Sequence, residues 1–349
     1  MTTLPIPLEG RRVVLIGGAG FIGHTLALEL KRQGAQVEVV DSLQVNNLLT
    51  YAAKMPELLH RDLYLKSLHQ RLDLLLENEV PLHVVDARDY AALNMVLDEA
   101  DPQVIVHLAA VAHAGKSNKD PYSTFDHSLR TLENALDYAR SRVEHFLFFS
   151  SSMVYGDFQS EAVSEEHPLE PKGIYGALKL AGEKLIIAYN QVFDLSYTII
   201  RPSALYGPRC VSRRVGQVFI ENALDGAKLQ VDGNGAEKLD FTFIEDLVVG
   251  VRQAIEHPAA RNQVLNLTYG EARSILDLLE VIRSQFPEVE VEFRERDKLM
   301  PVRGTLSVTK ARELIGYEPR HPIEVGFPKY IHWYKDLTAG KEPRVRLAK

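Results

Sequence analysis

The sequence predicts an α/β fold in which a doubly wound parallel sheet is followed by a smaller C-terminal α/β lobe. Two observations lead to this prediction. Short apolar runs alternate with segments of helical periodicity between residues 12 and 201, which is the pattern of successive βαβ units. From about residue 205 onward the elements become shorter and contain more Gly, Asp and Arg, which indicates a second lobe.

Six buried strands are expected in the first part of the chain. Each is a short apolar run that ends at a small or polar residue. The expected strands are 12–16, 36–40, 82–85, 103–108, 145–149 and 196–200. Ligands of such sheets bind beyond the carboxyl ends of the strands. The residues that follow each strand are therefore the first candidates for a binding site.

A glycine-rich turn joins the first strand to a helix expected over residues 21–33. Gly17 permits the tight turn, Gly20 lets a diphosphate approach the backbone, and Gly23 allows the helix to pack closely on the strand. Phe21 and Ile22 open the helix, whose N-terminus would face the diphosphate. This arrangement predicts a dinucleotide site of the Rossmann type.

Acidic residues at the ends of the next two strands indicate which dinucleotide is bound. Asp41 ends the second strand, where its carboxylate can accept hydrogen bonds from both ribose hydroxyls and would repel a 2′-phosphate, so NAD is favoured over NADP. Asp86 ends the third strand and could accept a bond from the adenine amino group, or cap a helix that begins near Tyr90. The other residues assigned to the cofactor site follow the third and fourth strands: Ala87, Leu108, Ala109 and Ala110.

Tyr175 and Lys179 lie one helical turn apart and therefore on one face of a predicted helix. A nearby ammonium favours the phenolate and lowers the tyrosine pKa from its usual value of about 10. This pair therefore predicts a proton shuttle that works near neutral pH. Three serines, at positions 150–152, precede it by about one βα unit and follow the fifth strand.

Taken together, these motifs resemble the extended short-chain dehydrogenase/reductase superfamily, in particular its NAD-dependent nucleotide-sugar epimerases and dehydratases. The resemblance runs through nearly the whole chain in the order that the family has. The matching segments are 17–23, Asp41, 85–89, 107–110, 150–156, 175–179, 201–209, 240–246 and 314–319.

The resemblance implies a role for each matching residue. Tyr175 corresponds to the catalytic tyrosine, Lys179 to the lysine that binds the nicotinamide ribose, and Ser151 to the catalytic serine or threonine. Ser150 and Ser152 could equally cap backbone groups. In the implied chemistry the tyrosine removes a proton from a sugar hydroxyl while hydride leaves the same carbon for NAD. Lowering a tyrosine pKa to about 7 takes about 4 kcal/mol.

The two residues after Ser151 narrow the reaction. Family 4,6-dehydratases carry an acidic pair at these positions, whereas this chain has Ser152 and Met153, and family decarboxylases usually have an acidic residue nearby. The leading hypothesis is an NAD-dependent nucleotide-sugar 4-epimerase, which oxidises C4 to a 4-keto sugar and then returns the hydride. A nucleotide-sugar dehydrogenase, a 4-keto reductase and a non-catalytic NAD-binding regulator remain as alternatives, ahead of a decarboxylase or dehydratase.

The expected substrate lobe departs from the family pattern. Ser203 stands where asparagine is frequent, and Leu239 where a diphosphate-binding arginine is usual. Arg303 resembles a later phosphate-binding arginine, and Arg209, Arg213 and Arg214 are available nearby, although each could be a solvated or ion-paired surface residue. The substrate-binding residues assigned from this pattern are Ser152, Ser203, Arg209 and Arg303. Neither the sugar nor the nucleotide follows from it.

Composition restricts the partners and the compartment. The 349 residues carry a formal net charge of −7, which gives no indication of a nucleic-acid surface. The single cysteine, Cys210, fits a reducing compartment, and neither a signal peptide nor a run long enough to cross a membrane is present, so a cytoplasmic enzyme is expected. His107 and His113 have no ligand set around them in the sequence, so no metal is expected.

The domain organisation follows from the element pattern. Residues 1–204, with about 240–268, are expected to form the NAD-binding domain, and residues 205–239 with 269–349 the nucleotide-sugar-binding lobe. The long connection 43–81 should contain a Leu-rich helix over 56–79 that covers the surface or an interface, or closes over the substrate. Helices near 122–141 and 175–193 resemble the two that pair across family homodimers, although their apolar faces could also pack within one monomer.

Overall fold

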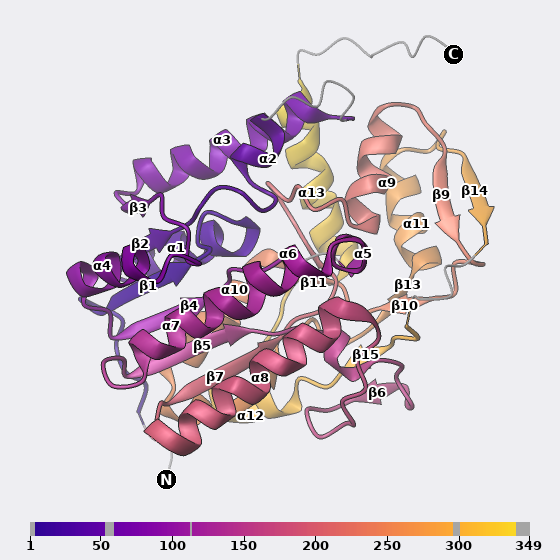
Figure 1. Cartoon of the computed structure of the whole chain (residues 1–349). Helices are drawn as coiled ribbons and strands as arrows, with labels where there is room; N and C mark the ends of the chain where they lie inside the picture. The colour runs from indigo at the N-terminus through magenta and orange to yellow at the C-terminus, as the bar shows by residue number, and fades with distance from the viewer. Residues whose placement is uncertain (1–3, 53–58, 112–113, 296–300, 340–349) are drawn as a thin grey trace.

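A parallel sheet of seven strands forms the centre of the molecule, in the order β12-β7-β5-β4-β1-β2-β3 (Figure 1). The computed structural model describes residues 4–52, 59–111, 114–295 and 301–339. The strands are β1 (Arg12–Ile16), β2 (Gln36–Val40), β3 (Leu82–His83), β4 (Val104–His107), β5 (His145–Phe149), β7 (Tyr197–Arg201) and β12 (Gln263–Asn266). The order reverses between β1 and β4, so the predicted doubly wound sheet is confirmed.

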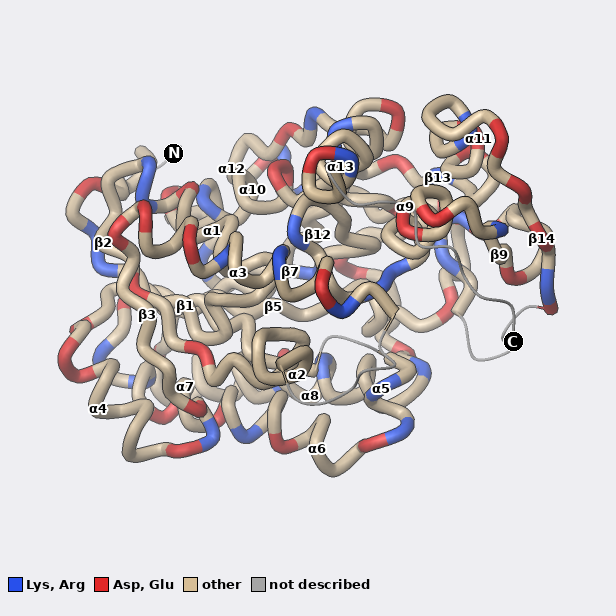
Figure 2. The backbone as a smooth tube through the Cα atoms, turned by 90° about the horizontal axis from the view of Figure 1, so that it is seen from above, with Lys and Arg blue, Asp and Glu red and all other residues tan. Residues whose placement is uncertain are grey.

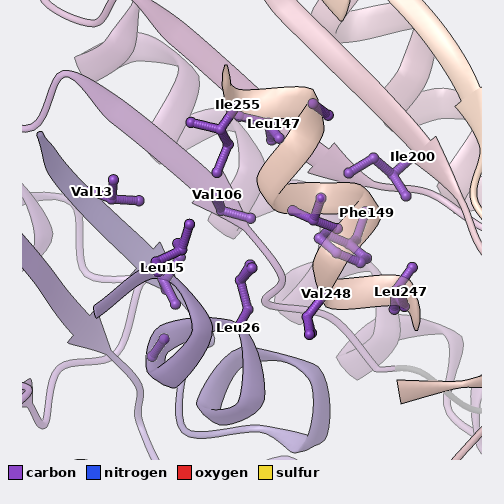
Figure 3. Packing of buried hydrophobic residues seen from close by; sticks show 14 of the residues in the cluster. Val13, Leu15, Leu26, Val106, Leu147, Phe149, Ile200, Leu247, Val248 and Ile255 are labelled. Atoms are coloured by element: carbon purple, nitrogen blue, oxygen red, sulfur yellow. The ribbon is translucent and has the colours of Figure 1, made fainter. Parts of the chain in front are cut away.

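Both faces of the sheet are buried because successive side chains of each strand point to opposite sides. Val13 and Leu15 of β1 belong to one apolar cluster, whereas Val14 and Ile16 belong to the other. Figure 3 shows part of the first cluster, in which side chains of the strands meet those of two helices. The near-continuous apolar runs of the strands therefore reflect a sheet that is covered on both faces.

Helices cover the two faces in separate sets. The first apolar cluster is closed by α1 (Phe21–Arg32), α3 (Arg61–Glu77), α10 (Ile244–Glu256) and α12 (Thr309–Ile315). The second is closed by α4 (Tyr90–Ala100), α7 (Thr131–Ala139) and α8 (Gly173–Phe193). Shorter helical segments precede α3 and α7: α2 (Leu48–Ala52), α5 (Ala114–Lys119), α6 (Pro121–Phe125) and a π-helical turn (Asp126–Arg130).

A third apolar cluster forms the core of the C-terminal lobe, which stands beside the carboxyl ends of the strands (Figure 1). Its helices are α9 (Val215–Leu224), α11 (Ile275–Gln285) and α13 (Ile323–Thr338). Its strand pairs are β9 (Leu229–Asp232) with β14 (Val291–Arg294), β10 (Lys238–Leu239) with β13 (Arg273–Ser274), and β8 (Leu205–Tyr206) with β11 (Thr242–Phe243). A further two-stranded pair is formed by β6 (Ala162–Val163) and β15 (Thr305–Leu306).

The division between the two parts differs from the predicted boundary at β11 and at α12. Phe243 of β11 belongs to the apolar cluster of the C-terminal lobe, although about 240–268 was assigned to the NAD-binding domain. Ala311 and Ile315 of α12 pack into the cluster of the central sheet, although 269–349 was assigned to the second lobe. The physical reason is that α12 has its apolar side chains facing α10 and β12. β12 joins the central sheet by pairing with β7, and α10 packs against α1.

The described residues of the connection 43–81 include the helices α2 and α3, and most of the predicted 56–79 helix is observed as α3. The beginning of that prediction, including Pro56, lies outside the described residues. One side of α3 faces residues of the C-terminal lobe, since the Tyr64 hydroxyl donates to Glu221 at 2.8 Å. The segment therefore connects the sheet to the lobe.

The surface carries charges of both signs, which Figure 2 shows interspersed along the outer helices and loops. Within the described part of the chain, no helix is both long enough and apolar enough to cross a bilayer.

Candidate active site

A cavity of about 530 Å³ lies beyond the carboxyl ends of the central strands and reaches the C-terminal lobe. Residues that follow β1, β2, β4 and β5 line it, as does the beginning of α8. It brings together all but one of the residues predicted from the sequence: Gly17, Gly20, Phe21, Ile22, Gly23, Asp41, Asp86, Ala87, Leu108, Ala109, Ala110, Ser151, Ser152, Tyr175, Lys179, Ser203 and Arg303. The exception is Arg209.

The glycine turn after β1 has the geometry of a diphosphate site. Gly17 has a φ of +83°, and a Cβ there would lie 2.6 Å from the Ala109 nitrogen, so only glycine fits. A Cβ on Gly23 would lie 2.5 Å from Gly18, which explains the close packing of α1 on β1. Gly20 is the N-cap of α1, no side chain caps this end, and its first turn contains no acidic residue. These residues fit the pyrophosphate of a dinucleotide.

Asp41 lies where a ribose would be bound. Its Oδ2 accepts a hydrogen bond of 3.0 Å from the Ala19 backbone N–H, and its Oδ1 accepts one of 2.7 Å from that of Leu43. Burial raises the pKa of this carboxyl, and the two backbone bonds oppose that shift. The side chain is thus held in one orientation on the cavity wall, which fits the ribose of a dinucleotide.

Asp86 lines the cavity but is held by Arg88, whose Nη2 lies 2.6 Å from its Oδ2. This hydrogen bond lowers the pKa of the Asp86 carboxyl. The helix that begins at Tyr90 is capped by Asp89, which accepts a bond of 3.0 Å from the Ala92 N–H. Asp86 is therefore not the helix cap, and its carboxylate remains at the expected adenine end of the site.

Three side chains of the predicted catalytic group meet where α8 approaches the end of β5. Ser151 caps a short 3₁₀ turn (Ser152–Tyr155), with its Oγ accepting from the Met153 N–H at 3.2 Å. A Cβ on Gly176 would lie 2.7 Å from the Met153 carbonyl oxygen, so this glycine lets α8 come close enough to bring Tyr175 to Ser151. The close approach of α8 to the 3₁₀ turn therefore explains why a glycine follows Tyr175.

Lys179 lies deeper in the same wall of the cavity. Its ammonium donates to the carbonyl oxygen of Phe149 at 2.5 Å and sits 4.9 Å from the centre of the Phe148 ring. Burial lowers the pKa of Lys179 to about 8, and the charge of Glu183 opposes this shift. Keeping the Lys179 amine protonated therefore costs free energy, because this wall of the cavity is shielded from solvent.

The predicted lowering of the Tyr175 pKa by Lys179 has no counterpart among the influences that act on the phenol, and the net shift of that pKa is upward. Burial raises the pKa of the Tyr175 phenol above its usual range. The influences that lower it are the charge of Arg214, a hydrogen bond from Ser151 and the charge of Arg303. Lys179 donates instead to the carbonyl oxygen of Phe149 at the end of β5. The positive charges that lower the Tyr175 pKa are those of Arg214 and Arg303.

Ser150 belongs to a buried network behind the site rather than to the cavity chemistry. Its hydroxyl donates to Glu183 at 2.5 Å, and Glu183 also forms an ion pair of 2.7 Å with Arg201. Both charged side chains are nearly inaccessible, with exposures of 3% for Arg201 and 2% for Glu183. The pair connects α8 to the last residue of β7 and so fixes the helix that carries Tyr175.

Arg209, predicted to bind substrate, is turned away from the cavity. Its Nε donates to His24 at 2.9 Å, and its carbonyl oxygen accepts from Arg71 Nε at 3.0 Å and Nη2 at 2.5 Å. The backbone of Arg209 has a φ of +64°, which directs the carbonyl toward α3. The substrate-binding assignment of Arg209 is therefore corrected to a role in holding the loop after β8.

Arg71 is a cavity residue that the motif analysis missed. It is almost fully buried, lies near Asp41, and its Nη1 has no hydrogen-bond partner among the described residues. A signal was present in the sequence, because Arg71 falls on the apolar stripe of α3 with Tyr64, Leu68 and Leu75. A cation at a core position of an amphipathic helix indicates a buried functional or structural contact.

The substrate side of the cavity is formed by loops and the C-terminal lobe. Ser203 lies here with a buried hydroxyl that has no described partner, and Leu239 lines the same wall. Arg213 and Arg214 line the cavity at the start of α9, whose N-terminus has no side-chain cap and no acidic residue in its first turn. No group of three potential metal ligands occurs in the ranges described, and His113 falls outside them.

Comparison with known proteins places the chain in a family. Residues 13–268 match the model of the NAD dependent epimerase/dehydratase family. The chain belongs to this family. It is therefore an enzyme of a family that uses NAD, and the predictions of the family and of the cofactor are confirmed.

The family relatives include several activities. An uncharacterised UDP-glucose epimerase of Bacillus subtilis is 28% identical over 95% of this chain and 100% of its own, and a UDP-glucose 4-epimerase of Mycolicibacterium smegmatis is 29% identical over 94% and 99%. A UDP-glucuronic acid decarboxylase of Arabidopsis thaliana is 26% identical over 97% of this chain and 72% of its own. Epimerases and decarboxylases are thus about equally similar in sequence.

A solved structure of the family has the same fold. The UDP-glucuronic acid 4-epimerase of Bacillus cereus, in complex with UDP-glucuronic acid and NAD, superposes with a TM-score of 0.82. It is 25% identical, with 93% of this chain and 99% of that chain covered. This similarity confirms the predicted Rossmann-type α/β architecture.

Proposed function

We propose that the protein is an NAD-dependent nucleotide-sugar 4-epimerase. The observation that carries this proposal is the acid content of the cavity. Within the described residues, the acidic side chains that line it are Asp41 and Asp86, and both lie at the cofactor end. Beside Ser151 and Tyr175 the wall is formed by Ser152 and Met153, which cannot supply the acid and base that expel water in a dehydratase.

In the proposed mechanism Tyr175 is the proton acceptor for the C4 hydroxyl of the sugar. Ser151 donates to the phenolic oxygen and can pass the proton between that oxygen and the sugar. The charges of Arg214 and Arg303 stabilise the phenolate against the effect of burial. NAD supplies the hydride acceptor and donor.

Lys179 has a positioning role in this proposal. Its ammonium is anchored to β5 through Phe149 and is buried next to Tyr175 along one face of α8. It would bind the ribose hydroxyls on the nicotinamide side, as the family resemblance implies. After oxidation the 4-keto sugar must turn within the cavity, so that the hydride returns to its other face and the product is the C4 epimer.

The proposal is tested by incubating the purified protein, without added cofactor, with UDP-sugars and following the products by NMR. Inversion at C4 is the expected result. A net change in NADH would indicate a dehydrogenase or reductase, and release of CO₂ would indicate a decarboxylase. Each of these results would contradict a 4-epimerase. The absence of any turnover from protein that contains NAD would favour a regulator.

We also propose a cytoplasmic homodimer. Apolar side chains are exposed on the helices that resemble the family's dimer helices: Tyr122 of α6 is 85% exposed and Val192 of α8 is 70% exposed. The buried, unpaired Cys210 is consistent with a reducing compartment. Light scattering of the purified protein should give the mass of two chains, and a monomer at micromolar concentration would contradict the dimer.

A further inference from the structure

Arg303 is placed in the cavity by a backbone that is fixed on both sides. The Val302 N–H donates to Asp157 at 2.9 Å, and the Phe158 N–H donates to the Val302 carbonyl at 2.9 Å. A Cβ on Gly304 would lie 2.7 Å from the Glu161 carbonyl oxygen, so the next residue must be glycine for this close approach. The chain around Arg303 is thus held against the segment that follows the catalytic serine.

The guanidinium of Arg303 lacks a strong partner. Its Nη2 donates to the sulfur of Met153 at 2.8 Å, and a thioether is a weak acceptor. It forms no ion pair with any carboxylate in the described parts of the chain. Burial lowers the pKa of Arg303 to about 10, and the group remains charged at neutral pH. A partly buried cation of this kind is stabilised when an anion binds next to it.

Arg303 lies at the reacting end of the cavity. Its positive charge lowers the pKa of the Tyr175 phenol, and its partner Met153 is two residues after Ser151. The C4 hydroxyl of a sugar must lie between Ser151 and Tyr175 for the proposed chemistry. The group nearest to Arg303 is then a substituent close to C4.

The diphosphate of the substrate cannot be that group. It is attached to C1, which lies across the pyranose ring from C4. Its charges are matched by Arg213, which lines the cavity beside the uncapped N-terminus of α9. The substituent next to C4 that varies among common hexoses is the one on C5, which is a hydroxymethyl group in glucose and a carboxylate in glucuronate.

From this geometry we propose that the substrate is a nucleoside diphosphate hexuronate, and that Arg303 binds the carboxylate on C5. The inference rests on the proposed 4-epimerase function, because it takes the position of C4 from that mechanism. Arg303 is then a specificity residue rather than the phosphate-binding residue expected from the family pattern.

The same contact explains how such a substrate would keep its carboxylate. A 4-keto hexuronate is a β-keto acid, so the C5–C6 bond can break with its electron pair moving toward C5 and the C4 oxygen while CO₂ leaves. An ion pair with Arg303 stabilises the carboxylate and not the neutral CO₂, which opposes this loss. No acidic residue lines this end of the described cavity to protonate C5 afterwards.

Binding measurements separate the carboxylate role of Arg303 from a diphosphate role. Calorimetry with UDP, UDP-glucose and UDP-glucuronate would use the NAD-loaded Tyr175→Phe protein, which prevents turnover, with and without Arg303→Met. UDP-glucuronate should bind more tightly than UDP-glucose, and Arg303→Met should weaken it by about 10- to 100-fold. Binding of UDP and of UDP-glucose should change by less than about threefold. Arg213→Met is the matched control and should weaken all three ligands alike.

Each result decides between the possibilities. Equal loss of UDP and UDP-glucuronate affinity in Arg303→Met would identify a diphosphate ligand and overturn the proposal, as would UDP-glucuronate binding no more tightly than UDP-glucose. The thermal unfolding of Arg303→Met reports whether the variant folds, and Arg303→Lys should recover part of the affinity if charge is what matters. Conversion of tightly bound UDP-glucuronate to a pentose with CO₂ would reject the 4-epimerase function and leave the carboxylate site intact.

Discussion

The ammonium of Lys179 donates a hydrogen bond of 2.5 Å to the carbonyl oxygen of Phe149, the last residue of β5. This contact joins the helix that carries Tyr175 to the strand that leads into Ser151. Lys179 is only 5% exposed, so the loss of hydration makes its protonated, charged form less favourable. The bond and the burial together give the site a pH dependence that can be measured.

The stability of the protein relative to Lys179→Met should rise with pH in alkaline solution. Burial lowers the Lys179 pKa from 10.5 to about 8 in the folded state, so between these values the unfolded chain binds a proton that the folded chain has released. The unfolding free energy of the wild type, relative to that of Lys179→Met, should therefore rise by about 3 kcal/mol between about pH 8 and pH 10.5. Urea titrations of both proteins, stripped of cofactor, measure it; parallel pH profiles would contradict the assignment.

Tyr175→Phe should bind NAD and lose turnover. The phenol is the proton acceptor in the proposed mechanism, whereas the ring packs in the wall of the cavity without its hydroxyl. Loss of a general base lowers kcat by about 10²- to 10⁴-fold. Fluorescence titration with NADH measures retained binding, and the NMR assay measures turnover. A variant that epimerises at a near-normal rate would remove Tyr175 from the mechanism.

Glu183→Gln should destabilise the protein far more than a surface substitution of the same kind. Glu183 pairs with Arg201 at 2.7 Å in a region without solvent, so the variant leaves a buried guanidinium without its counter-charge. The expected cost is about 3–5 kcal/mol of unfolding free energy.

The matched control for this pair is Asp98→Asn. Asp98 forms an ion pair with Arg142 in which both side chains are more than half exposed, so its loss should cost about 0–1 kcal/mol. Denaturant unfolding compares the two variants. Similar midpoints for both would show that the Glu183–Arg201 pair does not fix α8.

Gly17→Ala should abolish NAD binding and lower stability. The new Cβ would lie 2.6 Å from the Ala109 nitrogen, and the φ of +83° disfavours any side chain. The strain should cost about 2–4 kcal/mol. Gly226→Ala provides the control, because its φ is also positive, at +65°, but a Cβ there meets nothing within 4 Å. It should cost about 1 kcal/mol and leave NAD binding unchanged; equal effects of both would contradict a steric cause.

The sheet and the cofactor loop were predictable because they depend on local patterns. β1, β2 and β5 were predicted to the residue, since short apolar runs bounded by Gly and Asp leave few other structures. The strand β12 and the position of α12 were harder to predict because their contacts come from segments far apart in sequence. The outline of the cofactor site can therefore be predicted from local sequence patterns. The residues that form the opposite wall of the cavity cannot, because they come from segments far apart in sequence.

Arg209 and Arg303 show why residue types alone do not define the substrate side. Arg209 follows a proline and Arg303 precedes a glycine. Arg209, which has a positive φ, contacts His24, whereas Arg303 enters the cavity beside Met153. The outcome depends on one backbone dihedral and on a neighbouring loop. Neither is encoded within the few residues of the motif.

The bridge from Arg71 to the Arg209 carbonyl has a consequence for ligand exchange. Arg71 lies beside Asp41 at the cofactor end, and the carbonyl that it holds belongs to the loop that leads to Arg213 and Arg214 at the substrate end. The buried charge of Arg71 therefore lies close to groups at both the cofactor end and the substrate end of the cavity. Because coupling between two ligands is reciprocal, we expect the nucleotide sugar to tighten the binding of NAD, and NAD to tighten the binding of the nucleotide sugar by the same factor.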